Sequence, residues 1–167
     1  MPVAWESHAP PDYACPFCGL VAGDVSHPAN RCELGDLVHQ DEHVVVFIAC
    51  DGFGPYPGHA MICPTEHLEA LYDMDDAILA RISSMSRDVA LAMKLAWDPE
   101  GTSTRQHNEP AGNQHVWHYH LHVFPRWRDD MLYRQVRAPL SPEFRAQKAV
   151  ELRPALEKVL AEKRPSA

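Results

Sequence analysis

Three histidines alternate with apolar residues in the second half of the chain, in the run His118-Tyr-His120-Leu-His122. Side chains two residues apart on a β-strand share one face, so a strand over residues 115–124 would point the three imidazole rings the same way. Each buried ring nitrogen needs a hydrogen-bond partner, and close packing gains nothing from three such rings in a row. The spacing therefore indicates a chemical site rather than a packed core.

Two kinds of chemistry fit this run of histidines. In the first, all three rings bind one metal ion. In the second, one neutral imidazole attacks a phosphorus atom as a nucleophile near pH 7, while its neighbours donate hydrogen bonds to phosphate oxygens. The three histidines on their own leave both interpretations open.

A second pattern is the pair Cys15-Pro-Phe-Cys18, whose spacing suits metal or redox chemistry better than a disulfide framework. A redox pair of the thioredoxin type would need a helix directly after it within a βαβ unit. A tetrahedral zinc site would need two further nitrogen or sulfur ligands, and two unrelated reduced thiols are the third interpretation. We expect Cys32, Cys50 and Cys63 to be reduced thiols.

The elements that must position these residues follow from the apolar pattern. Two β-rich runs joined at Asp41-Glu42 predict an antiparallel hairpin, and the Gly- and Pro-rich run 51–58 predicts a loop. In chain order we expect strands over 34–40, 43–49 and 59–63, a long helix with its N-cap at Asp73, strands over 102–107 and 115–124, and a helix from Ser141 to about 163 with a kink or restart at Pro154. The fold class is therefore α+β, with an antiparallel sheet, one long helix packed on it and a C-terminal helix.

One face of the long helix is apolar, at the spacing of a helix that covers a sheet. The stripe consists of Ile78, Ile82, Met85, Val89, Ala92 and Ala96. On the histidine strand, the opposite parity carries Trp117, Tyr119, Leu121 and Val123. We expect this apolar face to pack against the helix, which leaves the histidine face open to a polar site.

Length and composition restrict the class of protein. The chain has 167 residues, enough for one domain with a core. Its formal net charge of −8 argues against broad binding to nucleic acid or an anionic membrane, so an anion site must be built by local geometry. No apolar stretch approaches the length of a membrane span, and we expect a cytoplasmic protein. The Pro-rich residues 1–13 predict a flexible arm, followed by a single domain over 14–167.

The histidine run resembles the His-x-His-x-His-x-x signature of the histidine-triad (HIT) family of nucleotide hydrolases and transferases, in which x is hydrophobic. The resemblance extends to the segment 111–117, to the segment 58–67 with its Gly-His and Pro-x-x-His elements, and to Cys15-x-x-Cys18, so that it covers residues 15 to about 128. It implies a HIT-like fold and an enzyme that cleaves at the α-phosphorus of a nucleotide. The substrates so implied are purine nucleotide phosphoramidates or dinucleoside polyphosphates.

By position, the resemblance implies a role for each matching residue. His120 would attack the α-phosphorus and carry the nucleotidyl group until water removes it, while His118 and His122 complete the triad. The expected nucleotide contacts are Asp51 on the ribose hydroxyls, Asn108 and Gln114 on ribose and phosphate, His59 and His122 on the phosphate or leaving group, and Phe47 beside the base. Asn113 and His115 stand where relatives usually have Gly and Ser or Thr, so the family's finer substrate preference does not transfer to this chain.

The same resemblance implies a structural zinc ion held by Cys15, Cys18, His67 and His118, and a homodimer formed through the long helix and the strand beside the site. The partners are then an AMP-type nucleotide and a second copy of the chain. Alternatives to the hydrolase are a nucleotidyl transferase with an acceptor other than water, a non-catalytic nucleotide-binding module, and a metal-binding protein with an ion on all three triad rings.

Overall fold

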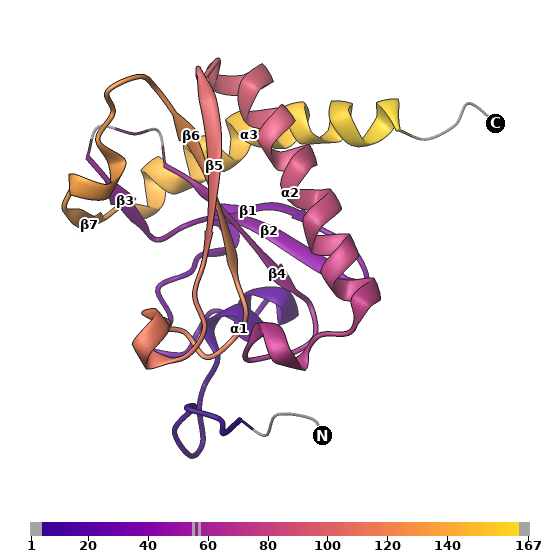
Figure 1. The fold of residues 1–167 in the computed structure, drawn as a ribbon, viewed down its shortest axis with the longest axis vertical. Coiled ribbons are helices and arrows are strands. Elements are labelled where there is room, and N and C mark those ends of the chain that lie inside the picture. Colours follow the sequence, from indigo (N-terminus) through magenta and orange to yellow (C-terminus); the bar gives the residue numbers. More distant parts are fainter. Residues whose placement is uncertain (1–4, 55, 57, 164–167) are drawn as a thin grey trace.

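The computed structural model describes residues 5–54, 56 and 58–163, and its centre is a twisted sheet flanked by helices (Figure 1). The sheet has five antiparallel strands in the order β1-β2-β4-β6-β5. These strands span Leu37–Gln40 (β1), Val44–Ile48 (β2), Ala60–Pro64 (β4), Gly101–Gln106 (β5) and Leu121–Arg126 (β6). The helices span Pro16–Ala22 (α1), Asp76–Trp97 (α2) and Pro142–Glu162 (α3). The predicted α+β class with an antiparallel sheet is confirmed.

A second, two-stranded sheet lies beside the first and was not predicted. It pairs β3 (Asp51–Phe53) with β7 (Arg137–Pro139). A three-residue strand shows too little alternation to stand out in a sequence, and we expected a loop over 51–58. Helix α1 was also not predicted: it is seven residues long, with Cys15 as its N-cap.

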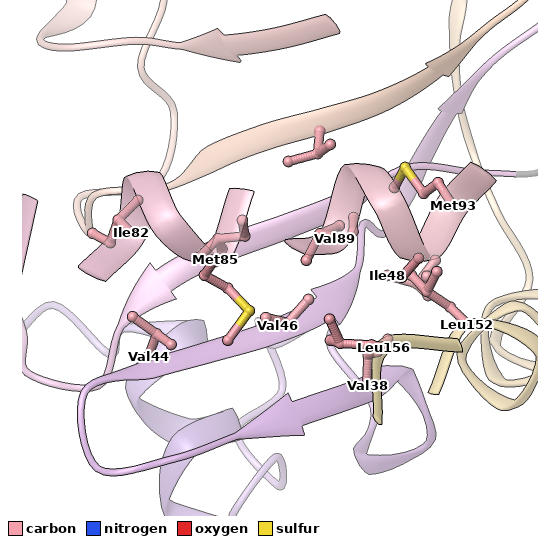
Figure 2. Packing of buried hydrophobic residues seen from close by; sticks show 14 of the residues in the cluster. Val38, Val44, Val46, Ile48, Ile82, Met85, Val89, Met93, Leu152 and Leu156 are labelled. Carbon is pink, nitrogen blue, oxygen red and sulfur yellow. The ribbon is translucent and has the colours of Figure 1, made fainter. Parts of the chain in front are cut away.

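Alternate residues of β2 point to opposite sides of the sheet and enter two separate cores. Val44, Val46 and Ile48 belong to the larger core, which α2 and α3 cover (Figure 2). Val45 and Phe47 belong to the smaller core, together with two apolar residues of α1. Strand β2 is therefore buried along its whole length, and the helices α2 and α3 lie on the side of the sheet opposite α1.

Helix α2 begins two residues later than predicted. Asp75 is the N-cap, and its carboxylate accepts a hydrogen bond from the backbone N–H of Ile78 at 2.8 Å. Asp73 instead ends a 3₁₀ turn, in which its side chain accepts a hydrogen bond from the backbone N–H of Ala70. Both aspartates are good capping residues, so the turn geometry decides between them.

The apolar stripe of α2 packs into the larger core, as the helical spacing predicted. Ile82, Met85 and Val89 are at most 2% exposed and lie within the core of the chain. The large apolar residues exposed on α2 are Leu91 and Leu95. Of the helices that the structure describes, none combines the length and apolar character of a bilayer span.

The histidine run is not one strand over 115–124, as we predicted. Strand β6 begins one residue before His122, so that His118 and His120 precede it. The segment before β6 bonds to the chain after β4 instead of to β5: the backbone N–H of Tyr119 donates to the carbonyl of Leu68 at 2.7 Å. Tyr119 nevertheless packs into the larger core beneath α2, as the alternation predicted.

Helix α3 begins where we predicted. Ser141 caps it by accepting a hydrogen bond from the backbone N–H of Phe144. The helix continues through Pro154 without the expected break, because its apolar side is held in the larger core on both sides of that residue. Arg145 of α3 forms a buried ion pair with Asp36 at 2.8 Å, which attaches the helix to the turn before β1.

Residues 5–13, the described part of the predicted arm, form no helix or strand but contact the domain. The Ser7 hydroxyl donates to the Glu69 carboxylate at 2.5 Å, and the backbone N–H of His8 donates to the same carboxylate at 2.8 Å. The first four residues of the arm lie outside the described part of the chain.

Candidate functional site

A cavity of about 390 Å³ lies beside the histidines, on the side of the smaller core. Its histidines are His59, His107, His115, His120 and His122. Its charged residues are Arg31, Arg105, Arg137 and Asp51, and its apolar residues include Phe17, Phe53 and Met61. This volume is in the range of small-molecule pockets, and the mixture of apolar walls and convergent polar groups is typical of them.

His120 stands at this cavity with one ring nitrogen fixed. Its Nδ1 donates a hydrogen bond to the backbone carbonyl of His118 at 2.7 Å, which leaves the lone pair on Nε2. Burial lowers the pKa of His120 to about 4, so the ring is neutral at pH 7. A neutral imidazole with a free nitrogen beside a pocket is equipped to act as a nucleophile or a base.

His59 and His122 form a pair next to His120. Nε2 of His59 lies 2.9 Å from Nδ1 of His122. Burial lowers the pKa of His59 to about 3, and burial together with the neighbouring His59 lowers the pKa of His122 well below its ordinary value. Both rings are therefore neutral at pH 7, and one of the two facing nitrogens donates to the other.

Four potential metal ligands meet where α1 approaches the histidine run. Cys15, Cys18, His67 and His118 each bring one ligand atom, and the four atoms lie within 4.8 Å of one another. The Sγ of Cys15 lies 3.3 Å from Nδ1 of His118, and the Sγ of Cys18 lies 3.1 Å from Nδ1 of His67. Ligands of a tetrahedral zinc ion stand about 3.3–3.8 Å apart at the usual zinc distances. The donor set therefore fits such an ion in its chemistry, and the two sulfur–nitrogen distances lie at or near this range.

The backbone holds His118 in the orientation that a metal ligand needs. Its Nε2 donates to the carbonyl of Pro64 at 3.0 Å, which leaves Nδ1 for the group formed with the two cysteines. Burial lowers the pKa of His118 to about 4, so the ring is neutral. Because His118 joins the cysteines, the described residues provide no group of ligands from all three triad rings, and the structure does not support that alternative.

Three residues that we expected to contact a nucleotide do not line the cavity. Phe47 is fully buried and packs against Phe17, which does line it. Asn108 uses its amide in hydrogen bonds with Gln106 and with a backbone N–H of the turn before α2. Gln114 is buried, and its amide bonds to three backbone groups. The amides of Asn108 and Gln114 are thus engaged in holding the loop between β5 and β6, and direct contact of these amides with a nucleotide stays a prediction.

Asp51, our expected ribose contact, lines the cavity, and its carboxylate already has cationic partners. Arg31 donates to both carboxylate oxygens, at 2.6 and 3.3 Å, and Nε of Arg137 lies 3.1 Å from Oδ2. Burial raises the pKa of Asp51, but hydrogen bonding and attraction from these arginines outweigh it, and the pKa is lowered overall. Asp51 is therefore ionised and fixed between two guanidinium groups.

The arginines of the cavity were not predicted from the sequence. Arg31 comes from a loop and Arg137 from the short strand β7, where no periodic pattern indicates the direction of a side chain. For Arg105 the sequence holds only its spacing of two residues from His107, and its pairing with His122 comes from the folded structure. Residues at this spacing on a strand share one face.

Comparison with known proteins adds four findings. Residues 33–129 match the profile of the HIT domain family, and this range includes the histidine run. The chain is 31% identical over 113 residues to Protein hit of Bacillus subtilis, covering 68% of this chain and 71% of the relative. It is 26% identical over 113 residues to adenosine 5'-monophosphoramidase hnt1 of Schizosaccharomyces pombe, covering 68% and 74%. The crystal structure of a Zn-bound histidine triad family protein from Mycobacterium smegmatis has a TM-score of 0.72 and 26% identity, over 90% of this chain and 98% of that one.

Proposed function

The chain belongs to the HIT family, and on that premise we propose that it is a nucleotide hydrolase that cleaves at the α-phosphorus of its substrate through a covalent nucleotidyl-histidine. The candidate substrates are purine nucleotide phosphoramidates and dinucleoside polyphosphates, and the relative named as an adenosine 5'-monophosphoramidase supports an AMP-type nucleotide. The observation that carries the proposal is the state of His120: its ring is neutral and borders the cavity, and its Nδ1 is held by a backbone carbonyl.

The reaction that we propose for His120 has two steps. In the first step, Nε2 attacks the α-phosphorus, a nitrogen–phosphorus bond forms, and the bond to the leaving group breaks with its electron pair on the leaving group. In the second step, water attacks the same phosphorus and loses a proton to the solvent, while the electron pair of the broken nitrogen–phosphorus bond returns to Nε2. The carbonyl of His118 accepts from Nδ1 throughout, which stabilises the positive charge that the ring carries in the intermediate.

We propose that the pair of His59 and His122 donates one hydrogen bond to the phosphate or the leaving group, from the ring that accepts within the pair. The ring centroids of His120 and His122 are 5.1 Å apart, and those of His59 and His122 are 5.0 Å apart. A phosphoryl group at His120 therefore lies close to a donor that is in place before the reaction begins, which is the arrangement that stabilises developing charge.

Of the other residues that we expected at the nucleotide, we propose a direct contact for one and indirect roles for three. Asp51 stays our candidate acceptor for the ribose hydroxyls, acting from between its two arginines. Asn108 and Gln114 act indirectly, by shaping the loop between β5 and β6. Phe47 acts through Phe17, on which it packs.

We further propose a structural Zn²⁺ held by Cys15, Cys18, His67 and His118. Four protein ligands make a closed site, so the ion would supply a clamp rather than an activated water. The clamp would attach the start of α1 to His118, whose carbonyl positions His120. The zinc-bound relative from Mycobacterium smegmatis supports this assignment. The homodimer and the cytoplasmic location stay predictions.

The variant His120→Ala tests the proposed function. Turnover of AMP-phosphoramidate, lysyl-adenylate, diadenosine triphosphate and diadenosine tetraphosphate should be lost, while nucleotide affinity changes by a modest factor because Asp51, His59 and His122 remain. The matched control is His43→Ala, since His43 is exposed and is not among the residues that line the cavity. Turnover in His120→Ala at the wild-type rate would contradict the proposal.

A further inference from the structure

We infer that Arg105 selects the leaving group, by binding the phosphate that follows the α-phosphorus. The inference rests on the proposed function and makes it more specific. It assigns to this chain nucleotides whose leaving group is itself a phosphate, as in dinucleoside polyphosphates, in preference to phosphoramidates of amines.

The first argument is the position of Arg105. It lies on β5 directly opposite His122 on β6, and opposed residues of antiparallel strands point to the same face of a sheet. Its guanidinium carbon lies 5.0 Å from the ring centroids of both Phe53 and Phe124. Phe124 is two residues beyond His122, on the side away from His120. Arg105 therefore reaches the region past His122, where a leaving group would lie when the α-phosphorus is at His120.

The second argument is that Arg105 lacks a polar partner within the described part of the chain. Its Nε is buried and makes no hydrogen bond. Arg31 and Arg137, by contrast, are paired with Asp51. The faces of Phe53 and Phe124 attract the cation but provide no hydrogen-bond acceptor. A buried donor without an acceptor is costly, and an anionic ligand would remove that cost.

The third argument is the local charge. The whole chain has a formal net charge of −8, yet the described residues that line the cavity include three arginines and a single carboxylate. The carboxylate of Asp51 forms ion pairs with Arg31 and Arg137. The charge of Arg105 is therefore available to a ligand. Its charge attracts a phosphate and repels a cationic amine such as a lysine side chain.

The fourth argument is the chemistry of departure. When a phosphate leaves, the electron pair of the broken phosphorus–oxygen bond stays on its bridging oxygen as negative charge, and no proton is required because phosphate is an anion at neutral pH. A guanidinium beside that oxygen stabilises the charge as it develops. An amine must instead gain a proton, and the adjacent His59 and His122 are neutral because burial lowers the pKa of each, with a further contribution from Arg105. Arg105 therefore assists one class of leaving group and hinders the other.

The kinetic test compares Arg105→Met, Arg105→Lys and wild type on two substrates, diadenosine tetraphosphate and AMP-phosphoramidate. Arg105→Met should lower kcat/KM for diadenosine tetraphosphate by about ten- to one-hundred-fold, the range of a charge-assisted hydrogen bond, and should not lower it for AMP-phosphoramidate. Arg105→Lys should recover part of the loss. The matched control is Arg87→Met, which removes an exposed arginine of α2 and should change neither value. Equal losses on both substrates, or no loss on the polyphosphate, would overturn the inference.

Binding separates this inference from the proposed function. Wild-type protein should bind ADP more tightly than AMP, and Arg105→Met should lose that preference, whether or not the protein turns over either substrate. If wild-type protein hydrolyses neither substrate, the proposed function fails, and the comparison of ADP with AMP still decides the role of Arg105. Equal affinity of the wild type for the two nucleotides would overturn that role. If circular dichroism shows that Arg105→Met does not fold, Arg105→Gln provides the same comparison.

Discussion

Titration of the buried His59 should make the stability of the protein depend strongly on pH. His59 is 2% exposed, and burial, with a smaller contribution from Arg105, lowers its pKa in the folded chain to about 3. In the unfolded chain the pKa returns to about 6.5. Between these two values the unfolded chain holds a proton that the folded chain does not. The free energy of unfolding is therefore fully present above pH 6.5 and falls as the pH is lowered toward about 3.

The size of this effect follows from the unfolded chain. At pH 5 the unfolded His59 is about 97% protonated, which stabilises the unfolded state by about 2 kcal/mol relative to pH 8. This figure does not change appreciably as long as the folded pKa lies below about 4. Urea unfolding at pH 8 and pH 5, followed by circular dichroism, measures the difference directly. In His59→Gln, which has no titrating ring, the pH 8 to pH 5 difference should be smaller than in wild type by about 2 kcal/mol.

The matched control for this experiment is His43→Gln, because His43 is exposed and its replacement should leave the wild-type pH dependence in place. An undiminished dependence in His59→Gln would refute the reasoning. It would mean that the folded chain accepts a proton at His59, and that the neutral pair of His59 and His122 is wrong.

Two further predictions concern the framework around the site. Wild-type protein should contain one zinc ion per chain by metal analysis. Cys18→Ser should lower the Tm markedly and the rate of the chemical step only slightly, because the site is closed and distinct from His120. Zinc retained in a Cys15/Cys18 double variant would contradict the assignment. Asp36→Asn should lower the free energy of unfolding by about 3–5 kcal/mol, because it leaves the buried Arg145 without its anionic partner. Replacing both residues by leucine should lower it less. A loss below about 1 kcal/mol for Asp36→Asn in urea unfolding would show that the pair is not buried in solution.

Most of the fold could be predicted from periodic patterns, and the errors lie where the pattern is short. The stripe on α2 and the alternation in β2 reflect burial over many residues. Each pattern therefore indicates the type of element and which of its faces are buried. Asp73 and Asp75 both accept a backbone hydrogen bond, but only Asp75 accepts it from the first turn of α2, and spacing cannot reveal that difference. The β3–β7 pair brings together segments more than eighty residues apart, and neither segment is long enough to show a period.

In the candidate site, too, the local patterns could be predicted from the sequence, whereas contacts between distant residues could not. The histidine run and the cysteine pair are local patterns, and the structure brings His118 and His67 to the cysteines, as the family resemblance implied. The hydrogen bonds of the Asn108 and Gln114 amides could not be predicted from the sequence, because their partners include residues distant in the chain. Arg105 needed the register between β5 and β6, which only the folded structure provides.

The covalent intermediate on His120 is the most direct test of the central claim. Wild-type protein quenched during turnover in a denaturant without acid should carry one nucleotidyl group, and mass spectrometry of its peptides should place that group on His120. The adduct should be released by mild acid, as expected for a phosphorus–nitrogen bond to an imidazole, and His120→Ala treated in the same way should carry none. A nucleotidyl group on another residue, or the same adduct on His120→Ala, would contradict the account.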